Sequence, residues 1–113
     1  MRFLSIVRID ENSGLRPSPK LMADMGKLME ELTREGKLVN TAGLMPTAEG
    51  TRIRLSGGKL SVVDGPFTEA KELIGGWALM ECRDKDEAVE WSKRFLGVLG
   101  HGEVRVRPVF GPE

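Results

Sequence analysis

The sequence is poor in the residues that build metal centres and nucleophilic sites. Cys82 and His101 are its only cysteine and histidine among 113 residues. A lone cysteine cannot form a disulfide within the chain, and zinc-type centres need several thiol, imidazole or carboxylate ligands. A catalytic Ser–His or Cys–His pair would have to use His101, which stands between two glycines. We therefore expect no metal and no cofactor.

Excess charge and long apolar runs are also missing. Seventeen basic residues balance seventeen acidic ones, so the formal net charge is zero. Proteins that bind phosphate backbones rely instead on an excess of Lys and Arg. No apolar run approaches the roughly 20 residues that cross a bilayer, and the first residues lack a secretory signal pattern. We expect a cytoplasmic protein that binds neither nucleic acid nor membranes.

What is present fits one globular domain over residues 1–113. Hydrophobic residues make up 40% and charged residues 30%, which is ordinary for a folded protein. Helical spacing of apolar residues predicts a helix over 18–35, and Asp84 is suited to cap a second helix that we expect to end near Gly97. Runs of β-branched and apolar residues predict strands at 3–9, 38–44, 51–55, 59–63, 77–82 and 103–110.

This order, βαβ, hairpin and βαβ, predicts a ferredoxin-like α+β plait with an antiparallel sheet. Both helices must then cover one face of the sheet, yet the strands carry apolar residues on both faces. An uncovered apolar face is normally an interaction surface. Two copies that packed these faces together would form a dimeric α+β barrel; a ligand or another protein is the alternative cover. The RNA-recognition motif shares the order, but Leu79 and Cys82 stand where its stacking aromatics belong.

The turn Asp64-Gly65-Pro66-Phe67 follows a predicted strand and is the most informative local feature. Gly and Pro impose a chain reversal there. In the structural interpretation Asp64 accepts backbone N–H bonds and Phe67 anchors the loop. In the functional interpretation, which is the weaker one for Asp64 alone, a pocket lies beside Phe67 and Trp77. There Asp64 acts as a general base, and Lys71 holds an anionic substrate.

The segment Val63–Phe67, followed by Glu69 and Lys71-Glu72, resembles the DGPF branch of the YCII-related family. The closing Glu103–Val109 segment supports a resemblance over essentially the whole chain. The resemblance implies a ferredoxin-like fold, a dimeric α+β barrel and a cleft near the turn. It also implies a link with extracytoplasmic-function sigma factors for some members. Wider relatives include small enzymes that act on aromatic or lactone compounds, where a His–Asp pair is suspected.

Met45 departs from this resemblance, because many relatives carry histidine at its place in Gly43-Leu44-Met45-Pro46. A thioether cannot transfer protons. We therefore expect a homodimeric small-molecule-binding domain or a weak, degenerate enzyme. The alternatives are a regulatory module that works with a sigma factor, and a cofactor-free isomerase, lyase or oxygenase that uses Asp64. The expected site comprises Asp64 as the catalytic residue and, for substrate binding, Met45, Phe67, Thr68, Glu69, Lys71 and Trp77.

Overall fold

The computed structural model describes residues 1–10, 18–67 and 73–111. Within them the chain forms the predicted strands and helices, although the strand predicted from residue 77 begins at Leu73 and the short 3-10 helix Thr47–Glu49 was not predicted. The elements in chain order are β1 (Arg2–Ile9), α1 (Pro19–Arg34), β2 (Leu38–Gly43), the short 3-10 helix η1 (Thr47–Glu49), β3 (Thr51–Ser56), β4 (Lys59–Asp64), β5 (Leu73–Glu81), α2 (Lys85–Leu99) and β6 (Glu103–Pro108).

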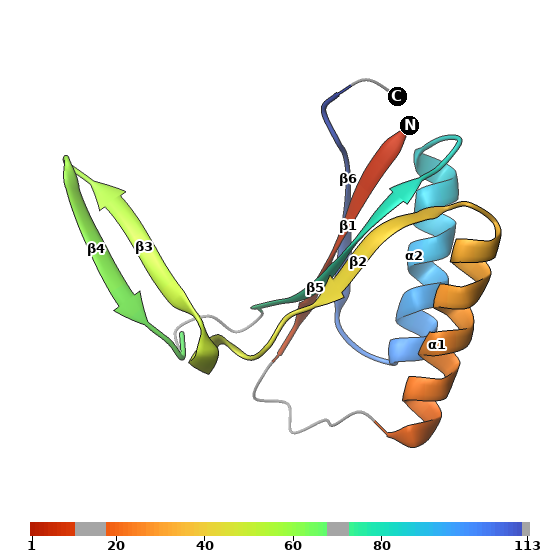
Figure 1. Cartoon of the computed structure of the whole chain (residues 1–113), viewed down its shortest axis with the longest axis horizontal. Coiled ribbons are helices and arrows are strands. Elements are labelled where there is room, and N and C mark those ends of the chain that lie inside the picture. Colours follow the sequence, from red (N-terminus) through yellow and green to blue (C-terminus); the bar gives the residue numbers. More distant parts are fainter. Residues whose placement is uncertain (11–17, 68–72, 112–113) are drawn as a thin grey trace.

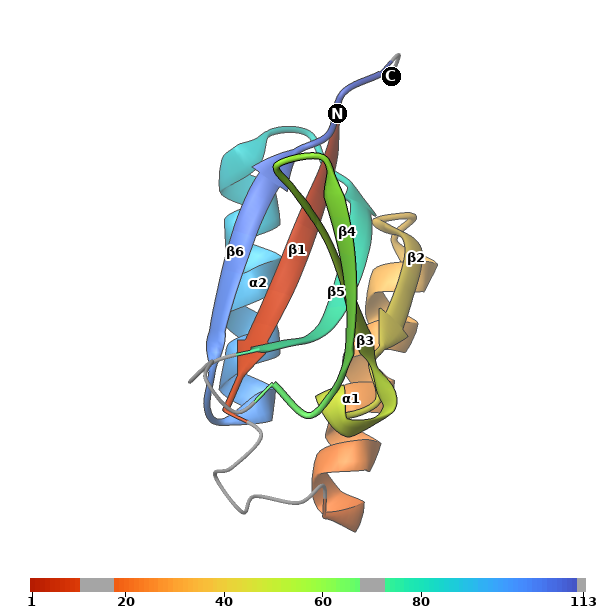
Figure 2. The same cartoon turned by 90° about the vertical axis from the view of Figure 1, so that its left-hand side faces the viewer.

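Four of the strands form one antiparallel sheet in the order β2-β5-β1-β6. Both helices lie on the same face of this sheet, as Figures 1 and 2 show. The two βαβ units therefore interlock as a ferredoxin-like plait, which confirms the predicted fold class. We call this sheet with α1 and α2 the body.

The start of each helix follows from its capping residue. The Ser18 hydroxyl accepts the Leu21 N–H at 3.0 Å, and Pro19 occupies the first turn, where its missing N–H costs nothing. In α2 the Asp84 carboxylate accepts the Glu87 N–H at 2.9 Å. Both caps are as predicted.

The predicted early end of α2 at Gly97 is wrong. The helix continues to Leu99 and ends at Gly100, which has a φ of +85°. Gly97 faces open space, and a glycine inside a helix costs only about 1 kcal/mol relative to alanine. The flanking apolar side chains Phe95, Val98 and Leu99 are partly buried, and their packing outweighs that cost.

The core of the body lies where the two helices close over the sheet. Phe3, Leu28, Leu32 and Met80 are each at most 3% exposed. Phe3 and Met80 alternate along β1 and β5 with residues on the opposite face of the sheet. Leu28 and Leu32 recur at helical spacing along α1, as burial of one face requires. Among the described residues, no helix has the length and apolarity needed to span a bilayer.

Among the described strands, β3 and β4 pair only with each other, and they project from the body as a separate two-stranded ribbon (Figure 1). We call this hairpin, residues 51–64, the arm. Its tight turn uses Gly57 and Gly58 at φ of +57° and +78°, a conformation that favours glycine. The predicted hairpin is thus confirmed, and its isolation from the main sheet is what the sequence did not reveal.

Candidate functional site

The Asp64–Phe67 turn lies at the root of the arm and packs against η1. The Gly65 N–H donates to the Gly50 carbonyl at 2.9 Å, and the bond between Gly65 and Pro66 is cis. A Cβ atom on residue 65 would collide with the carbonyl oxygen of Thr47. Glycine is therefore required here by the close approach of two backbones.

Asp64 pairs with Thr51 on the first rung of the arm. The Thr51 hydroxyl donates to the Asp64 carboxylate at 2.9 Å, and the Asp64 side chain is exposed. This contact ties the ends of β3 and β4 together. This donor is a side-chain hydroxyl, whereas the structural interpretation expected backbone N–H donors to Asp64.

Phe67 takes its partners from the same root. The Arg52 guanidinium lies 4.5 Å from the centre of the Phe67 ring, and the Phe67 N–H donates to the Thr47 hydroxyl at 3.3 Å. A cation over an aromatic face is attracted by the ring quadrupole. Thr47, Gly50 and Arg52 were missed in the sequence, because nothing local links them to a turn more than ten residues away.

The remaining predicted site residues are scattered. Met45 is 74% exposed on the segment that leads to the arm. Trp77 is half-buried in the middle of β5, where its carbonyl accepts the Thr41 hydroxyl at 2.8 Å. Phe67 and Trp77 thus take their partners from different parts of the fold. Thr68, Glu69 and Lys71 lie outside the described residues.

The face of the sheet opposite the helices carries its own apolar residues. Phe3, Ser5 and Val7 point toward the helices and are buried, so Leu4 and Ile6 lie on the other face. Register places Leu79 beside Leu4 and Trp77 beside Ile6. We call this surface the open face; its four side chains are half-buried without cover from a helix.

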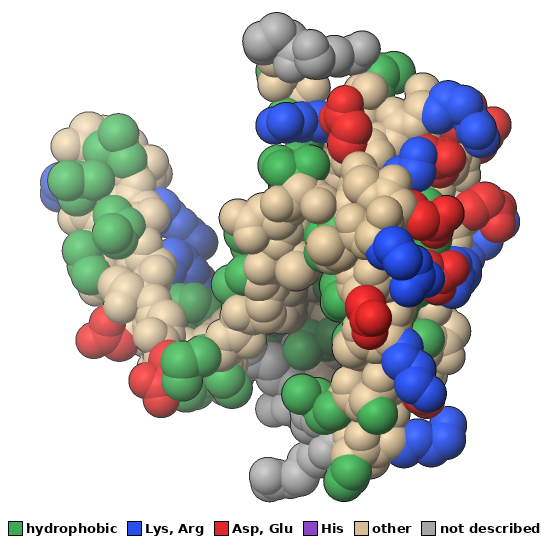
Figure 3. All heavy atoms as spheres, turned by 45° about the vertical axis from the view of Figure 1, so that its right-hand side comes forward, with side chains coloured by type: hydrophobic (Ala, Val, Ile, Leu, Met, Phe, Trp, Pro, Cys, Tyr) green, Lys and Arg blue, Asp and Glu red, His purple; other side chains and the backbone are tan. Residues whose placement is uncertain are grey.

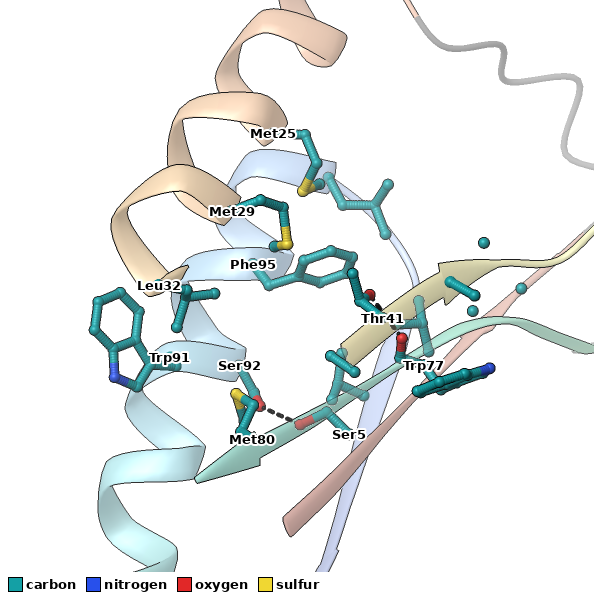
Figure 4. A pocket seen from close by; sticks show the side chains of 18 of the residues that line it. Ser5, Met25, Met29, Leu32, Thr41, Trp77, Met80, Trp91, Ser92 and Phe95 are labelled. Atoms are coloured by element: carbon teal, nitrogen blue, oxygen red, sulfur yellow. Dashed lines mark hydrogen bonds between the residues drawn. The ribbon is translucent and has the colours of Figure 1, made fainter. Parts of the chain in front are cut away.

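A cavity of about 450 Å³ lies between the helices and the sheet. Both helices, together with β1, β2, β5 and β6, contribute to its walls, and Figure 4 shows Met25, Met29 and Phe95 directed into the space between the layers. Met45, Asp64 and Phe67 do not line it. Trp77 borders it from β5, although its ring lies on the open face of the sheet (Figure 4). This cavity was not predicted, because no sequence signal separates a lining residue from a packed one.

Cys82 is 3% exposed in the core, and burial is the main cause that raises the pKa of its thiol. The buried thiol is therefore a poor nucleophile. In residues 1–10, 18–67 and 73–111 no three Cys, His, Asp or Glu side chains gather closely enough to hold a metal ion.

The charged residues concentrate on the helical side of the body, whereas the arm displays many hydrophobic side chains (Figure 3). Glu31 of α1 accepts two hydrogen bonds from Arg94 of α2 at 2.6 and 3.1 Å. The Lys37 ammonium donates to the Glu87 carboxylate at 2.9 Å. The Arg83 N–H and, next in size, the Lys37 ammonium lower the pKa of Glu87. These contacts support the helices rather than the turn.

Comparison with known proteins identifies the family. The chain matches the model of the YCII-related domain over residues 1–111. An uncharacterised protein of Rhizobium meliloti (strain 1021) is 33% identical to it over 91 residues, which cover 80% of this chain and 73% of the relative. The match spans the body, the arm and the Asp64–Phe67 turn alike. The chain therefore belongs to the YCII-related domain family.

Proposed function

We propose that the protein is a homodimer that binds a small molecule in a cleft beside the Asp64–Phe67 turn. The observation that carries this proposal is the apolar arm. A ribbon of two strands is marginally stable by itself in water, and it gains stability when its apolar face is covered.

The register of the arm sorts its side chains by face. Ile53 pairs with Val62 and Leu55 with Leu60, so these four side chains share one face. They are 65% to 71% exposed. Each Å² of apolar surface removed from water contributes about 25 cal/mol, so a partner that covered this face would be bound favourably. The opposite face carries Arg54 and Ser61.

The open face is the second uncovered apolar surface of the same molecule. Sheets that pack face to face lie about 10 Å apart and interdigitate their side chains. Leu4, Ile6, Trp77 and Leu79 provide such a surface, and a second copy carries the same one. A two-fold axis would therefore match the open faces to each other.

The turn lies at the root of the arm, where the arm leaves the body. Packing of a second copy would shelter Phe67 and the exposed Met45 from water and so create a cleft. Binding is better supported than catalysis, because the Asp64 carboxylate accepts the Thr51 hydroxyl at the root of the arm. The substrate-binding roles predicted for Thr68, Glu69 and Lys71 remain predictions.

Light scattering tests the assembly. The wild type is expected at about twice 12.5 kDa at micromolar concentration. Leu60→Glu puts a charge on the apolar face of the arm and is expected to favour the monomer. Ser61→Glu puts the same charge on the opposite face and should stay dimeric. A monomeric wild type would refute the homodimer, and an unaffected Leu60→Glu dimer would remove the arm from the interface.

A thermal-shift screen over a panel of small metabolites tests the ligand site. We expect at least one compound to raise the unfolding midpoint of the wild type, because a ligand that binds only the folded state stabilises it. Phe67→Ala should abolish this shift. The matched control is Phe110→Ala, since Phe110 is fully exposed near the end of the described chain. If no compound raises the midpoint, the ligand part of the proposal fails.

The exposed arm also favours one second candidate, an interaction module that covers the arm with another protein, such as a sigma factor. This candidate predicts a monomeric wild type whose arm is covered in a complex of one copy with the partner. A catalytic role for Asp64 as an isomerase, lyase or oxygenase base has its own test. It requires Asp64→Asn to abolish turnover in a folded protein.

A further inference from the structure

We infer that the cavity between the helices and the sheet is a second binding site, which takes a neutral apolar molecule. The site is distinct from the Asp64–Phe67 turn, because Met45, Asp64 and Phe67 do not contribute to its walls. It lies inside a single copy of the chain. The inference therefore does not depend on the homodimer.

The first argument is the contrast between the two ends of the helix–sheet layer. At one end Phe3, Leu28 and Met80 are at most 3% exposed. At the other end the side chains that face the same layer, such as Ile9 and Phe95, are only partly buried. The layer is therefore tightly packed at one end and less closely packed at the other, where Ile9 and Phe95 line the cavity.

The second argument is size. Protein interiors are close-packed and rarely contain voids much larger than a water molecule. The cavity of about 450 Å³ is partly open to solvent rather than a closed void, and it is many times larger than a water molecule. An apolar cavity of about 150 Å³ is large enough for benzene, and ligand sites typically span about 300–1,000 Å³. The volume therefore matches an organic molecule of two or three fused rings or a medium-length hydrocarbon chain.

The third argument is the chemistry of the walls: none of the described residues that form them has a charged side chain. Their three hydroxyls already have partners. Ser5 and Ser92 lie within hydrogen-bond distance at 3.1 Å, Ser92 donates to the Ala88 carbonyl at 2.8 Å, and Thr41 donates to the Trp77 carbonyl at 2.8 Å. Figure 4 shows the Ser5–Ser92 pair at the floor between β1 and α2. A charged ligand would lose its hydration there without compensation.

The fourth argument is the adaptable lining on α1. Met25 and Met29 reach from this helix toward Phe95 of α2 (Figure 4). Thioether side chains are flexible and polarisable, and they make favourable contacts with aromatic rings. Such a wall can adjust to ligands of different outline. The site therefore favours neutral, apolar ligands and discriminates less between ligand shapes.

Methionine methyl NMR on the wild type gives a direct test, with naphthalene as a flat probe and 1-decanol as a chain. We expect saturable chemical-shift changes for the methyl groups of Met25 and Met29. Met22 and Met45 serve as internal controls, because they are 63% and 74% exposed and do not line the cavity. No saturable change with either probe would overturn the inference. So would changes centred on Met45, which would instead place the probe near the turn.

A filling variant gives a second test. Ala78 lines the cavity, so Ala78→Leu occupies part of its volume. We expect it to weaken binding of both probes about tenfold or more, in line with the effect of extra methylenes in an apolar pocket. Ala23→Leu adds the same atoms on the exposed side of α1 and should leave the affinity unchanged. Equal affinities of a folded Ala78→Leu variant and the wild type would contradict the site.

Discussion

The body and the arm use the same local pattern and reach opposite outcomes. In β1, Phe3, Ser5 and Val7 alternate with outward residues and are buried beneath the helices. In the arm, Ile53 and Leu55 alternate with arginines in the same way, yet each is 68% exposed. Alternation sets which side chains share a face, whereas a second layer decides whether that face is buried. Among the described residues, no second layer covers the apolar face of the arm.

Thiol chemistry should show the largest difference between the two regions. Ser61→Cys places a thiol on the polar face of the arm, while Cys82 is buried in the core of the body. In this variant we expect two phases with a thiol reagent near pH 8. The arm thiol should react about a hundredfold or more faster, because Cys82 reacts only in molecules that open. Comparable rates would show that the core around Cys82 opens readily.

Leucine-to-alanine substitutions in the body and in the arm should differ by several kcal/mol in their effect on the free energy of unfolding. Leu32 is 3% exposed in the body, so Leu32→Ala should lower the free energy of unfolding by about 2–5 kcal/mol. Leu55 is 68% exposed, so Leu55→Ala should change it by no more than about 0.5 kcal/mol in dilute protein. Urea denaturation measures both values. A Leu55→Ala loss that grows with protein concentration would show that the arm is covered by another copy.

The smallest difference between the body and the arm should appear in the pH dependence of stability. The folded-state pKa of Glu87 is lowered from 4.5, first by the Arg83 N–H and then by Lys37. Its carboxylate therefore stabilises the fold above about pH 4.5, and this contribution is lost as the pH falls through the folded-state pKa. Glu87→Gln should be less stable than the wild type near pH 7, and the difference should shrink in acid.

Two controls sharpen this pH test. Glu90→Gln removes an exposed carboxylate whose pair with Lys93 lies on the helix surface, so it should have little effect at either pH. Asp64→Asn removes the exposed partner of Thr51 in the arm and should also change the stability of the body little. A Glu87→Gln deficit that persisted unchanged in acid would contradict the assigned role of the Glu87 carboxylate.

Much of the fold was predictable because its signals are local. Ser18 and Asp84 cap helices with side chains that bond to the backbone three residues away. Gly57 and Gly58 supply the turn of the arm. The prediction at Gly97 failed because a helix end depends on how the flanking side chains pack, and that packing involves distant strands.

The site was less predictable than the fold. The Asp64–Phe67 turn was correctly singled out as a family marker, but its contacts with Thr47 and Gly50 join separate segments. Trp77 lies in the middle of β5 and its carbonyl accepts a hydrogen bond from β2, whereas Phe67 takes its partners from the root of the arm. The cavity went unpredicted because Met25 and Phe95 have the same spacing whether they touch a neighbour or line a space.

The sequence by itself determined the strands, the helices and their caps, the tight turn of the arm and the family. These depend on hydrogen bonds and periodicities within a few residues, which the order of side chains specifies directly. The sequence also predicted the uncovered apolar face of the sheet. Only the tertiary structure decided that the arm stands apart and that the helices and the sheet border a cavity. Each of these depends on the distance between whole layers, which is set by the sum of many contacts between segments remote in sequence.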